Sequence, residues 1–191
     1  EALQSLTLII DDLPCMDNSS TRRNKTSTHI KYSESETILS SIYIITKLNN
    51  ELLIELYDIN NTQQINVLYK NKQLSIKSLN KILFDTLCDN IVLGQLLDLG
   101  KKYEFLTKEK NKYFNNVYCK NTIIIILKTS SLFSLAFILG VLYSRKENID
   151  IYDFYEMGTH YGILYQIVDD LIDYKEDSKK NYNYVREIGI D

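Results

Sequence analysis

Asp11-Asp12-Leu13-Pro14-Cys15-Met16-Asp17 is the stretch around which the chain is organised, and Arg22 and Arg23 follow it closely. It places three carboxylates and two guanidinium groups within thirteen residues, directly after an apolar run. Near the other end, Asp169-Asp170-Leu171-Ile172-Asp173 repeats an aspartate pair with a third aspartate, again after an apolar run at residues 161–168. Two acidic clusters so far apart in the sequence are explained if they face each other across one cavity.

The overall composition favours one mostly helical domain. The 191 residues are enough for one substantial hydrophobic core and too few for two independent domains. One proline and six glycines leave few helix breakers among many good helix formers. The net charge of −3 indicates neither a nucleic-acid-binding surface nor a basic membrane-binding surface.

The cysteines predict an intracellular location. Cys15, Cys88 and Cys119 are odd in number, widely spaced and without a Cys-x-x-Cys pair. This pattern favours reduced thiols, in the cytoplasm or an organelle, over a disulfide framework or a zinc site.

No transmembrane segment is expected. The most apolar stretch, residues 132–143, holds about a dozen residues, whereas a helix needs about 20 to span a bilayer. We interpret this stretch as a buried helix. The chain starts at Glu1 inside an apparent helix and ends at Asp191 without a terminating pattern, which indicates a fragment of a longer protein.

Helical periodicity predicts where the first acidic cluster lies. Apolar residues spaced as Leu3, Leu6 and Ile10 predict a helix that ends at the aspartate pair. Pro14 should kink or bulge this helix, and a bulge would bring Asp17 back to the side of the pair. Ser33 and Glu36 have the spacing of a capping box.

The remaining elements follow from the same periodicity. We expect a loop at residues 18–28, helices at 38–56, 79–98, 117–144 and 150–174, an Asn-rich connection at 58–64 and a solvated basic stretch at 70–77.

The second acidic cluster suits a magnesium site. Its i, i+1, i+4 spacing puts Asp169 and Asp173 on one helical face with Asp170 alongside. Carboxylates this close repel each other unless a cation neutralises them, and Mg²⁺ binds through one or two carboxylates together with phosphate oxygens. The alternative, a solvated acidic helix end, is weakened because two such clusters each follow an apolar helix.

Several basic and amide residues have two possible interpretations each. Arg22 and Arg23 suit a phosphate, although arginines in a loop commonly lie on the surface. Lys128, in an apolar helix, either extends to water or faces a polar cavity. Gln95 and Gln166 lie in apolar helical runs, where a buried amide with a backbone partner is the simpler explanation.

Taken together, the motifs make the sequence similar to the trans-prenyltransferases, which synthesise farnesyl, geranylgeranyl and longer prenyl diphosphates. The segments that carry the resemblance are residues 5–23, Gly94-Gln95-x-x-Asp98, Lys128-Thr129 and residues 165–173. Their order and approximate spacing agree with the family along nearly the whole chain. The family's basic motif upstream of the first aspartates is absent from this sequence, so the resemblance implies a fragment that lacks the N-terminal helices.

The resemblance implies an all-α, isoprenoid-synthase-type helical bundle with a central cavity, formed as a single partial domain by residues 1–191. It implies two substrates, isopentenyl diphosphate and an allylic prenyl diphosphate. It also implies a homodimer and about three Mg²⁺ ions per site. The carboxylates that it assigns to the metal are Asp11, Asp12, Asp17, Asp169, Asp170 and Asp173. The residues that it assigns to substrates are Arg22 and Lys128 for the allylic diphosphate, Arg23 for isopentenyl diphosphate, Thr129 and Gln166 beside the developing cation, and Lys179 as a further diphosphate ligand.

The sequence departs from the family pattern at several positions. Asn24 and Ser130 stand where glycine is usual, and Ser41-Ile42 replaces a Gly-Asp pair. A noncatalytic subunit that regulates a prenyl diphosphate synthase therefore stays open as an alternative, and a terpene cyclase is a weaker one. The resemblance also bears on product length. Leu6 and Thr7 stand where bulky aromatics stop elongation at farnesyl, which predicts a geranylgeranyl or longer product.

Overall fold

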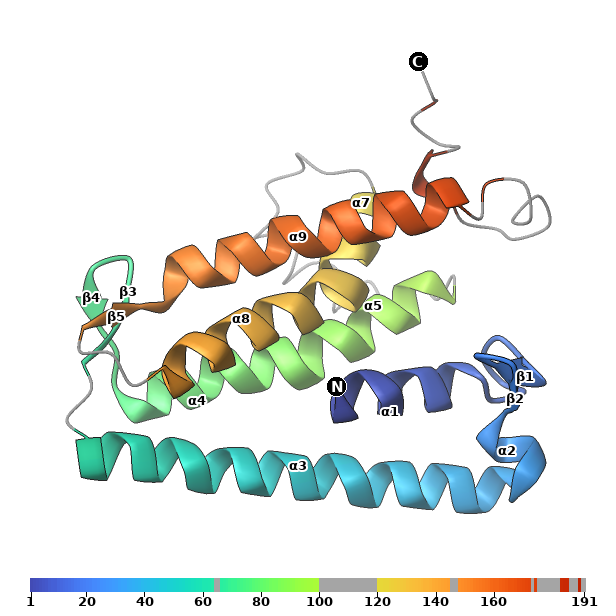
Figure 1. Ribbon diagram of the computed structural model, residues 1–191, viewed down its shortest axis with the longest axis horizontal. Coiled ribbons are helices and arrows are strands. Elements are labelled where there is room, and N and C mark those ends of the chain that lie inside the picture. The colour runs from blue at the N-terminus through green and yellow to red at the C-terminus, as the bar shows by residue number, and fades with distance from the viewer. Residues whose placement is uncertain are drawn as a thin grey trace. The chain divides into compact units, whose positions relative to one another are not determined.

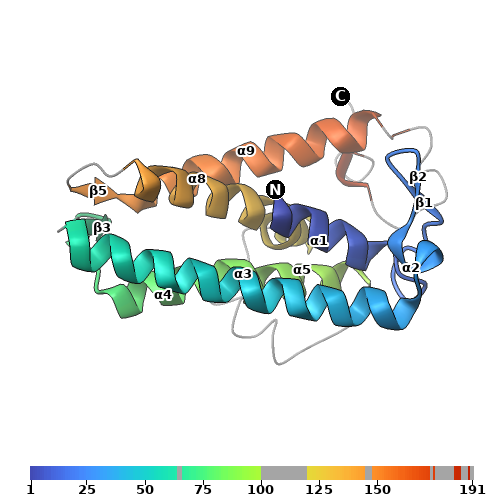
Figure 2. The same ribbon diagram turned by 60° about the horizontal axis from the view of Figure 1, so that its bottom comes forward.

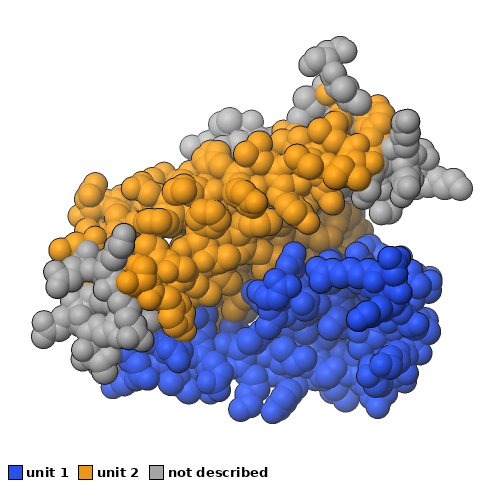
Figure 3. Space-filling view, in the orientation of Figure 1, with its two compact units in different colours: residues 1–62 blue, residues 63–191 orange. Residues whose placement is uncertain are grey.

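The computed structural model describes residues 1–63, 66–99, 120–144, 148–172, 174, 183–185 and 189. It divides into two compact units, residues 1–62 and residues 63–191, which Figure 3 colours separately. Each unit is built mainly from helices, so the all-α prediction is confirmed, and the few strands are only two or three residues long.

The first unit contains two longer helices joined by a small hairpin. Its elements are α1 (Ala2–Asp11), β1 (Thr21–Arg22), β2 (Lys25–Thr26), α2 (Thr28–Lys31) and α3 (Glu34–Gln63). Figures 1 and 2 both show α1 beside the first half of α3.

Helix α1 stops before the proline instead of continuing through it as a kinked helix. The backbone N–H of Leu13 bonds to Ile10 and that of Met16 bonds to Leu13, so the chain leaves α1 in consecutive turns. Proline disfavours helical geometry in the residue before it and has no N–H to donate, which explains an end at this place. The turns nevertheless return Asp17 to the helix end, because its N–H donates to the Asp11 carbonyl at 2.9 Å.

The predicted loop at residues 18–28 contains a tight antiparallel hairpin. Thr21 pairs with Thr26 and Arg22 pairs with Lys25. The two turn residues, Arg23 and Asn24, have φ angles of 51° and 61°. Two-residue turns with both φ positive match the twist of the strands, and asparagine tolerates this conformation better than most residues. Asn24 thus fulfils the conformational role of the usual glycine.

Helix α3 begins at the predicted capping box. The Ser33 hydroxyl accepts the backbone N–H of Glu36 at 3.1 Å and donates to its carboxylate at 2.8 Å. The helix continues to Gln63. The expected end near residue 56 and the connection at 58–64 are therefore wrong, because asparagine lowers helix propensity without breaking a helix that is already formed.

The second unit is a stack of antiparallel helices capped by a three-stranded sheet. Its strands are β3 (Val67–Tyr69), β4 (Lys72–Gln73) and β5 (Ile149–Asp150), in the order β4-β3-β5. The helical elements are α4 (Ile76–Phe84), η1 (Asp85–Asn90), α5 (Ile91–Asp98), α7 (Lys120–Ile124), η2 (Ile125–Ser130), α8 (Ser131–Tyr143) and α9 (Ile151–Ile172). The predicted helices 79–98, 117–144 and 150–174 agree with these elements to within a few residues at their ends where the structure describes them, whereas the strands were missed.

Two π-helical turns, η1 and η2, interrupt otherwise continuous helices. The turn η2 packs between α5 and α9, and α8 packs between η1 and α9. Figures 1 and 2 show α8 and α9 as an antiparallel pair.

The most apolar helical stretch is longer than the dozen residues expected from the sequence. It runs from Asn121 to Tyr143, and by length and composition alone it could cross a membrane. In this structure 44% of its most apolar window is buried, and core helices of soluble proteins pass the same test, so it is weak evidence for a span.

Candidate functional site

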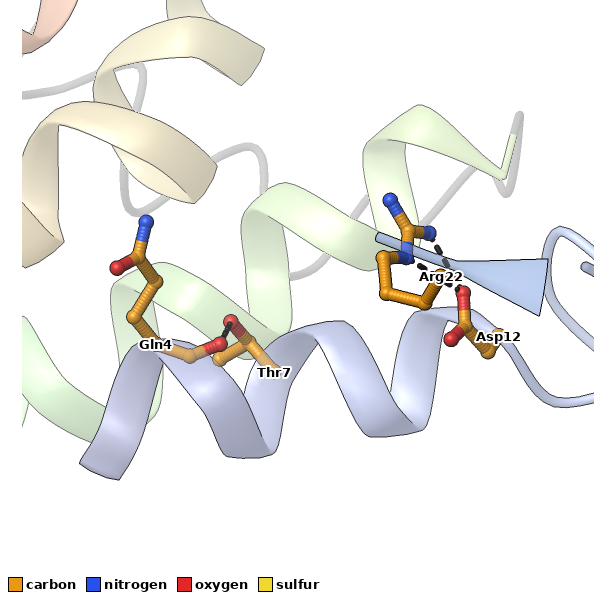
Figure 4. Close-up of polar contacts among 4 residues, drawn as sticks. All are labelled: Gln4, Thr7, Asp12 and Arg22. Atoms are coloured by element: carbon orange, nitrogen blue, oxygen red, sulfur yellow. Dashed lines mark hydrogen bonds and ion pairs between the residues drawn. The ribbon is translucent and has the colours of Figure 1, made fainter. Parts of the chain in front are cut away.

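The first acidic motif surrounds one arginine. Arg22, on β1, donates from Nε and Nη2 to Oδ1 of Asp12 at 2.9 and 2.6 Å (Figure 4). Asp12 is only 2% exposed, whereas the Arg22 side chain is 38% exposed. The hydrogen bond to Asp12 raises the pKa of Arg22, burial opposes the rise, and the charges of Asp12, Asp11 and Asp17 add to it. The structure therefore brings the three predicted carboxylates of this motif around a single guanidinium.

The carboxylates of this motif differ in exposure. Asp11, the last residue of α1, is half-buried, and Asp17 is exposed after the turns that follow Pro14. Cys15, between them, is exposed and forms no disulfide with another described residue. The side chains of Asp11 and Asp17 are therefore the more accessible members of the motif.

The second acidic motif lies at the C-terminal end of α9 and is part of a hydrogen-bonded chain. Thr129 Oγ1 donates to Gln166 Oε1 at 2.8 Å, and Gln166 Nε2 donates to Asp170 Oδ1 at 2.8 Å. Asp170 is buried and also accepts the backbone N–H of Tyr184, whereas Asp169 is exposed. The simpler interpretation of Gln166, a backbone-bonded amide, is replaced by this side-chain chain. Asp173 and Lys179 lie outside the described residues.

Lys128 lies in the π turn η2 and has a specific counter-ion. Its Nζ donates to Asp98 Oδ2 at 2.7 Å, and each side chain is about a quarter exposed. Sequence reasoning noted Asp98 only as part of a motif and missed this pairing. The signal was present, because an aspartate at the end of an apolar helix and a lysine within another need partners when they are only partly exposed.

The backbones of η2 and its neighbours approach each other at glycines. A Cβ built on Gly94 of α5 would lie 2.5 Å from the Lys128 nitrogen, and one on Gly162 of α9 would lie 2.5 Å from the Ser130 Cα. These contacts hold Lys128 and Thr129 at fixed positions between α5 and α9. Ser130 fits sterically because its neighbour Gly162 has no side chain, but its buried hydroxyl has no hydrogen-bond partner among the described residues.

The remaining candidate residues lie in the hairpin and helices of the first unit. Arg23 is exposed at the hairpin turn, beside the partly buried Arg22. Leu6 is buried, and Thr7 is half-buried with its hydroxyl bonded to the Gln4 carbonyl at 2.9 Å (Figure 4). At the departure from the Gly-Asp pair, the buried Ser41 hydroxyl donates to the Thr37 carbonyl of its own helix, so the serine is satisfied locally.

The two motifs fit Mg²⁺ without forming a complete cage. Among the residues described here, no three His, Cys, Asp or Glu side chains are grouped so as to hold a metal ion. Mg²⁺ commonly binds through one or two carboxylates and takes its other ligands from water and substrate phosphates, so an incomplete set of oxygen donors suits it. Asp11, Asp17 and Asp169 are the carboxylates whose exposure fits this role best.

Known proteins match nearly the whole of this chain. The sequence model of the family described as Polyprenyl synthetase matches residues 1–185. Farnesyl diphosphate synthase of Buchnera aphidicola is 28% identical and matches 96% of this chain and 58% of its own length. Geranylgeranyl diphosphate synthase of Cyanophora paradoxa is 28% identical and matches 91% and 51%. This chain thus spans little more than half the length of these relatives.

A solved structure supports the fold. Geranyltransferase from Helicobacter pylori, complexed with magnesium and isoprenyl diphosphate, aligns with a TM-score of 0.58 and 28% identity over 90% of this chain and 50% of that one. The isoprenoid-synthase-type fold expected from the sequence is therefore confirmed. With a family match over nearly its whole length, the chain belongs to the polyprenyl synthetase family.

Proposed function

We propose that the complete protein elongates prenyl chains by condensing isopentenyl diphosphate with an allylic diphosphate in the presence of Mg²⁺. The observation that carries this proposal is the arrangement on η2. Lys128 and Thr129 are adjacent there, one paired with Asp98 and the other bonded to Gln166. A cation for a leaving diphosphate and an oriented dipole for a developing carbocation are thus held by one rigid turn.

The chemistry has two bond changes and one proton loss. The allylic C–O bond breaks and the electron pair leaves with diphosphate, whose charge Lys128 and Arg22 would stabilise. The double bond of isopentenyl diphosphate then attacks the allylic carbon to form the new C–C bond. This attack leaves a positive charge on the isopentenyl unit. Loss of a proton from the carbon next to that charge forms the new double bond, and we assign the released diphosphate as the acceptor of the proton.

Bound Mg²⁺ would supply charge neutralisation at the diphosphate. The accessible carboxylates of each unit would offer it oxygen ligands, Asp11 and Asp17 in the first unit and Asp169 in the second, and Arg23 would bind isopentenyl diphosphate. Thr129 and Gln166 would present oxygen dipoles to the allylic carbon, while surrounding apolar helices exclude water that would quench the cation.

Product length and assembly are further parts of the proposal. The relatives include both farnesyl and geranylgeranyl diphosphate synthases, so the comparisons favour neither product. Leu6 and Thr7 support a geranylgeranyl or longer product, since neither provides the bulk of an aromatic ring. We propose a homodimer, without a transmembrane segment, on the basis of the family resemblance.

A regulatory, noncatalytic role receives less support. Of the sequence departures that suggested it, Asn24 adopts the turn conformation of the usual glycine, and Ser130 fits sterically against Gly162. The residues that would bind substrate also retain specific partners, as Arg22 and Lys128 show.

The test uses the complete protein with Mg²⁺, isopentenyl diphosphate and geranyl or farnesyl diphosphate, followed by mass spectrometry of the products. Longer prenyl diphosphates are expected. Cyclic hydrocarbons would instead show a cyclase, and turnover only after a second subunit is added would show a regulatory role.

A matched pair of lysines sharpens this assay. Lys128→Ala should lower kcat by about 100-fold or more, because it removes a charge from the leaving group. Lys81 also pairs with an aspartate, Asp85, at 2.9 Å, but on an exposed helical surface. Lys81→Ala should retain the wild-type rate, and equal losses in both variants would contradict the assignment of Lys128.

A further inference from the structure

We propose that Asp170 is a positioning residue that fixes the orientation of the Gln166 amide, and through it the Thr129 hydroxyl, and that it does not bind metal. This inference rests on the proposed function for its catalytic consequence. Its structural part, the polarity of the hydrogen-bonded chain, stands on this structure alone.

Burial separates the two aspartates of the pair. Asp170 is 5% exposed, whereas Asp169 belongs to the exposed class. Successive residues of a helix point about 100° apart, so Asp170 can face the interior of the protein while Asp169 faces solvent. The first motif shows the same division, with Asp12 buried on Arg22 and Asp17 exposed.

Both carboxylate oxygens of Asp170 already accept protein hydrogen bonds. Oδ1 accepts from Gln166 Nε2 at 2.8 Å, and Oδ2 accepts from the backbone N–H of Tyr184 at 2.7 Å. Asn183, which is also buried, donates from Nδ2 to the Asp170 carbonyl at 2.9 Å. Hydrogen bonds to a buried carboxylate are strengthened by its charge, so a metal would have to displace favourable contacts at a site with little access to water.

This arrangement dictates the direction of every donor in the chain. An ionised carboxylate only accepts, so Gln166 must turn its Nε2 towards Asp170 and its Oε1 towards Thr129. Thr129 must then donate its hydroxyl proton to Gln166. The lone pairs of the Thr129 oxygen are left for the allylic carbon, which is the orientation that stabilises a developing positive charge.

Asp170→Asn reverses this polarity with almost no change of shape. The oxygen of the substituted amide must still accept the Tyr184 N–H, so the amide nitrogen faces Gln166. Gln166 then rotates to present Oε1 to that donor and Nε2 to Thr129. Thr129 becomes the acceptor, and its proton points away from Gln166. We expect kcat to fall by about 100-fold, a loss typical of removing one preorganised electrostatic contact.

A second substitution should restore Thr129 as the donor in its hydrogen bond with residue 166. In the double variant Asp170→Asn with Gln166→Glu, the new carboxylate at position 166 accepts from both the amide at position 170 and Thr129, and the pair keeps its net charge of −1. We expect at least a roughly tenfold recovery of kcat relative to Asp170→Asn. Asp170→Asn should leave the Mg²⁺ concentration for half-maximal rate unchanged, whereas Asp169→Asn should raise it several-fold. A raised requirement in Asp170→Asn, or no recovery in the double variant, would overturn the proposal.

Unfolding in EDTA provides a readout that needs neither metal nor activity. Asp170→Ala should lower the Tm of the metal-free protein by about 5 °C or more, because it leaves Gln166 and the Tyr184 N–H without their acceptor. Asp169→Ala, at an exposed position, should lower it by less. If the wild-type protein fails to elongate prenyl chains, the proposed function fails, but this comparison still decides the role of Asp170. An unchanged Tm in Asp170→Ala would refute that role.

Discussion

Gly94 of α5 lies directly against the backbone of Lys128 in η2, where an added Cβ would stand 2.5 Å from the amide nitrogen and 2.8 Å from the Cα. Real Cβ atoms essentially never approach backbone so closely. The contact explains how a π turn, which widens a helix, can be packed tightly against a neighbouring helix. It also links the position of a proposed substrate-binding lysine to a residue that itself has no side chain.

Gly94→Ala should therefore destabilise the protein. We expect a loss of about 2 kcal/mol or more in the free energy of unfolding, because only backbone movement can relieve the overlap. The KM for the allylic substrate should rise as Lys128 shifts. Urea denaturation and steady-state kinetics of the complete protein would measure both effects.

Gly140→Ala is the matched control for this prediction. Gly140 lies in α8 with nothing within 4 Å of an added Cβ, so alanine should stabilise the helix by about 0.5–1 kcal/mol. A similar loss of unfolding free energy in the two variants would show that the close approach of Gly94 to the Lys128 backbone does not cause the destabilisation.

The turn between the two strands of the first hairpin should prefer glycine or asparagine at position 24. The φ of Asn24 is 61°, which costs other L-residues about 1–2 kcal/mol. Asn24→Val should therefore reduce stability by about that amount, and Asn24→Gly should leave it unchanged or slightly higher. Chemical denaturation would test the order, and a valine variant as stable as the glycine variant would contradict it.

Asp150 should stabilise the protein only above acidic pH. Its carboxylate accepts the backbone N–H groups of Asn71, Tyr152 and Lys70 at 2.6, 3.0 and 3.2 Å. Burial is the largest single contribution and opposes the shift, but the three hydrogen bonds together outweigh it and lower the pKa of Asp150 below its ordinary value. Because the pKa in the folded state lies below that of the unfolded chain, the stabilisation is complete above the unfolded pKa. It is lost as the pH falls through the folded pKa.

The measurement compares the Tm of wild type and Asp150→Asn across pH. We expect a clear difference near neutral pH that shrinks as the pH falls below about 4. A difference that stays constant down to about pH 2 would show that the charge of Asp150 is not responsible.

An aromatic ring at position 7 should shorten the product. Thr7 lies on α1 four residues before Asp11, and its hydroxyl bonds only within its own helix in the contacts described. Thr7→Phe adds bulk without removing a tertiary hydrogen bond, so it should shift the product mixture towards farnesyl diphosphate. Thr7→Ser is the control and should leave product lengths as in wild type. Mass spectrometry of the products would reveal the change, and unaltered lengths in Thr7→Phe would contradict the assignment of this position to the product pocket.

The sequence by itself determined the helical class, the main helices and the family. Periodic apolar residues predict helices wherever burial of one face outweighs local propensity, as in α5, α8 and α9. The spacing of the two acidic motifs, together with Lys128-Thr129, was sufficient to indicate the family. These features depend on residues close together in the sequence or on the order of motifs along it, so they can be predicted without knowing which helices pack together.

Only the tertiary structure decided how the functional side chains are partnered. It placed Asp12 on Arg22, Lys128 on Asp98 and Asp170 on Gln166. In particular, the sequence treated the two aspartates of each pair as equivalent, whereas folding buries Asp12 and Asp170. The strands, the π turns and the exact end of α3 were likewise missed. The pairing of β3 with β5 and of Lys128 with Asp98 depends on contacts between segments distant in the sequence, and the energy of such contacts is absent from any local pattern of residues.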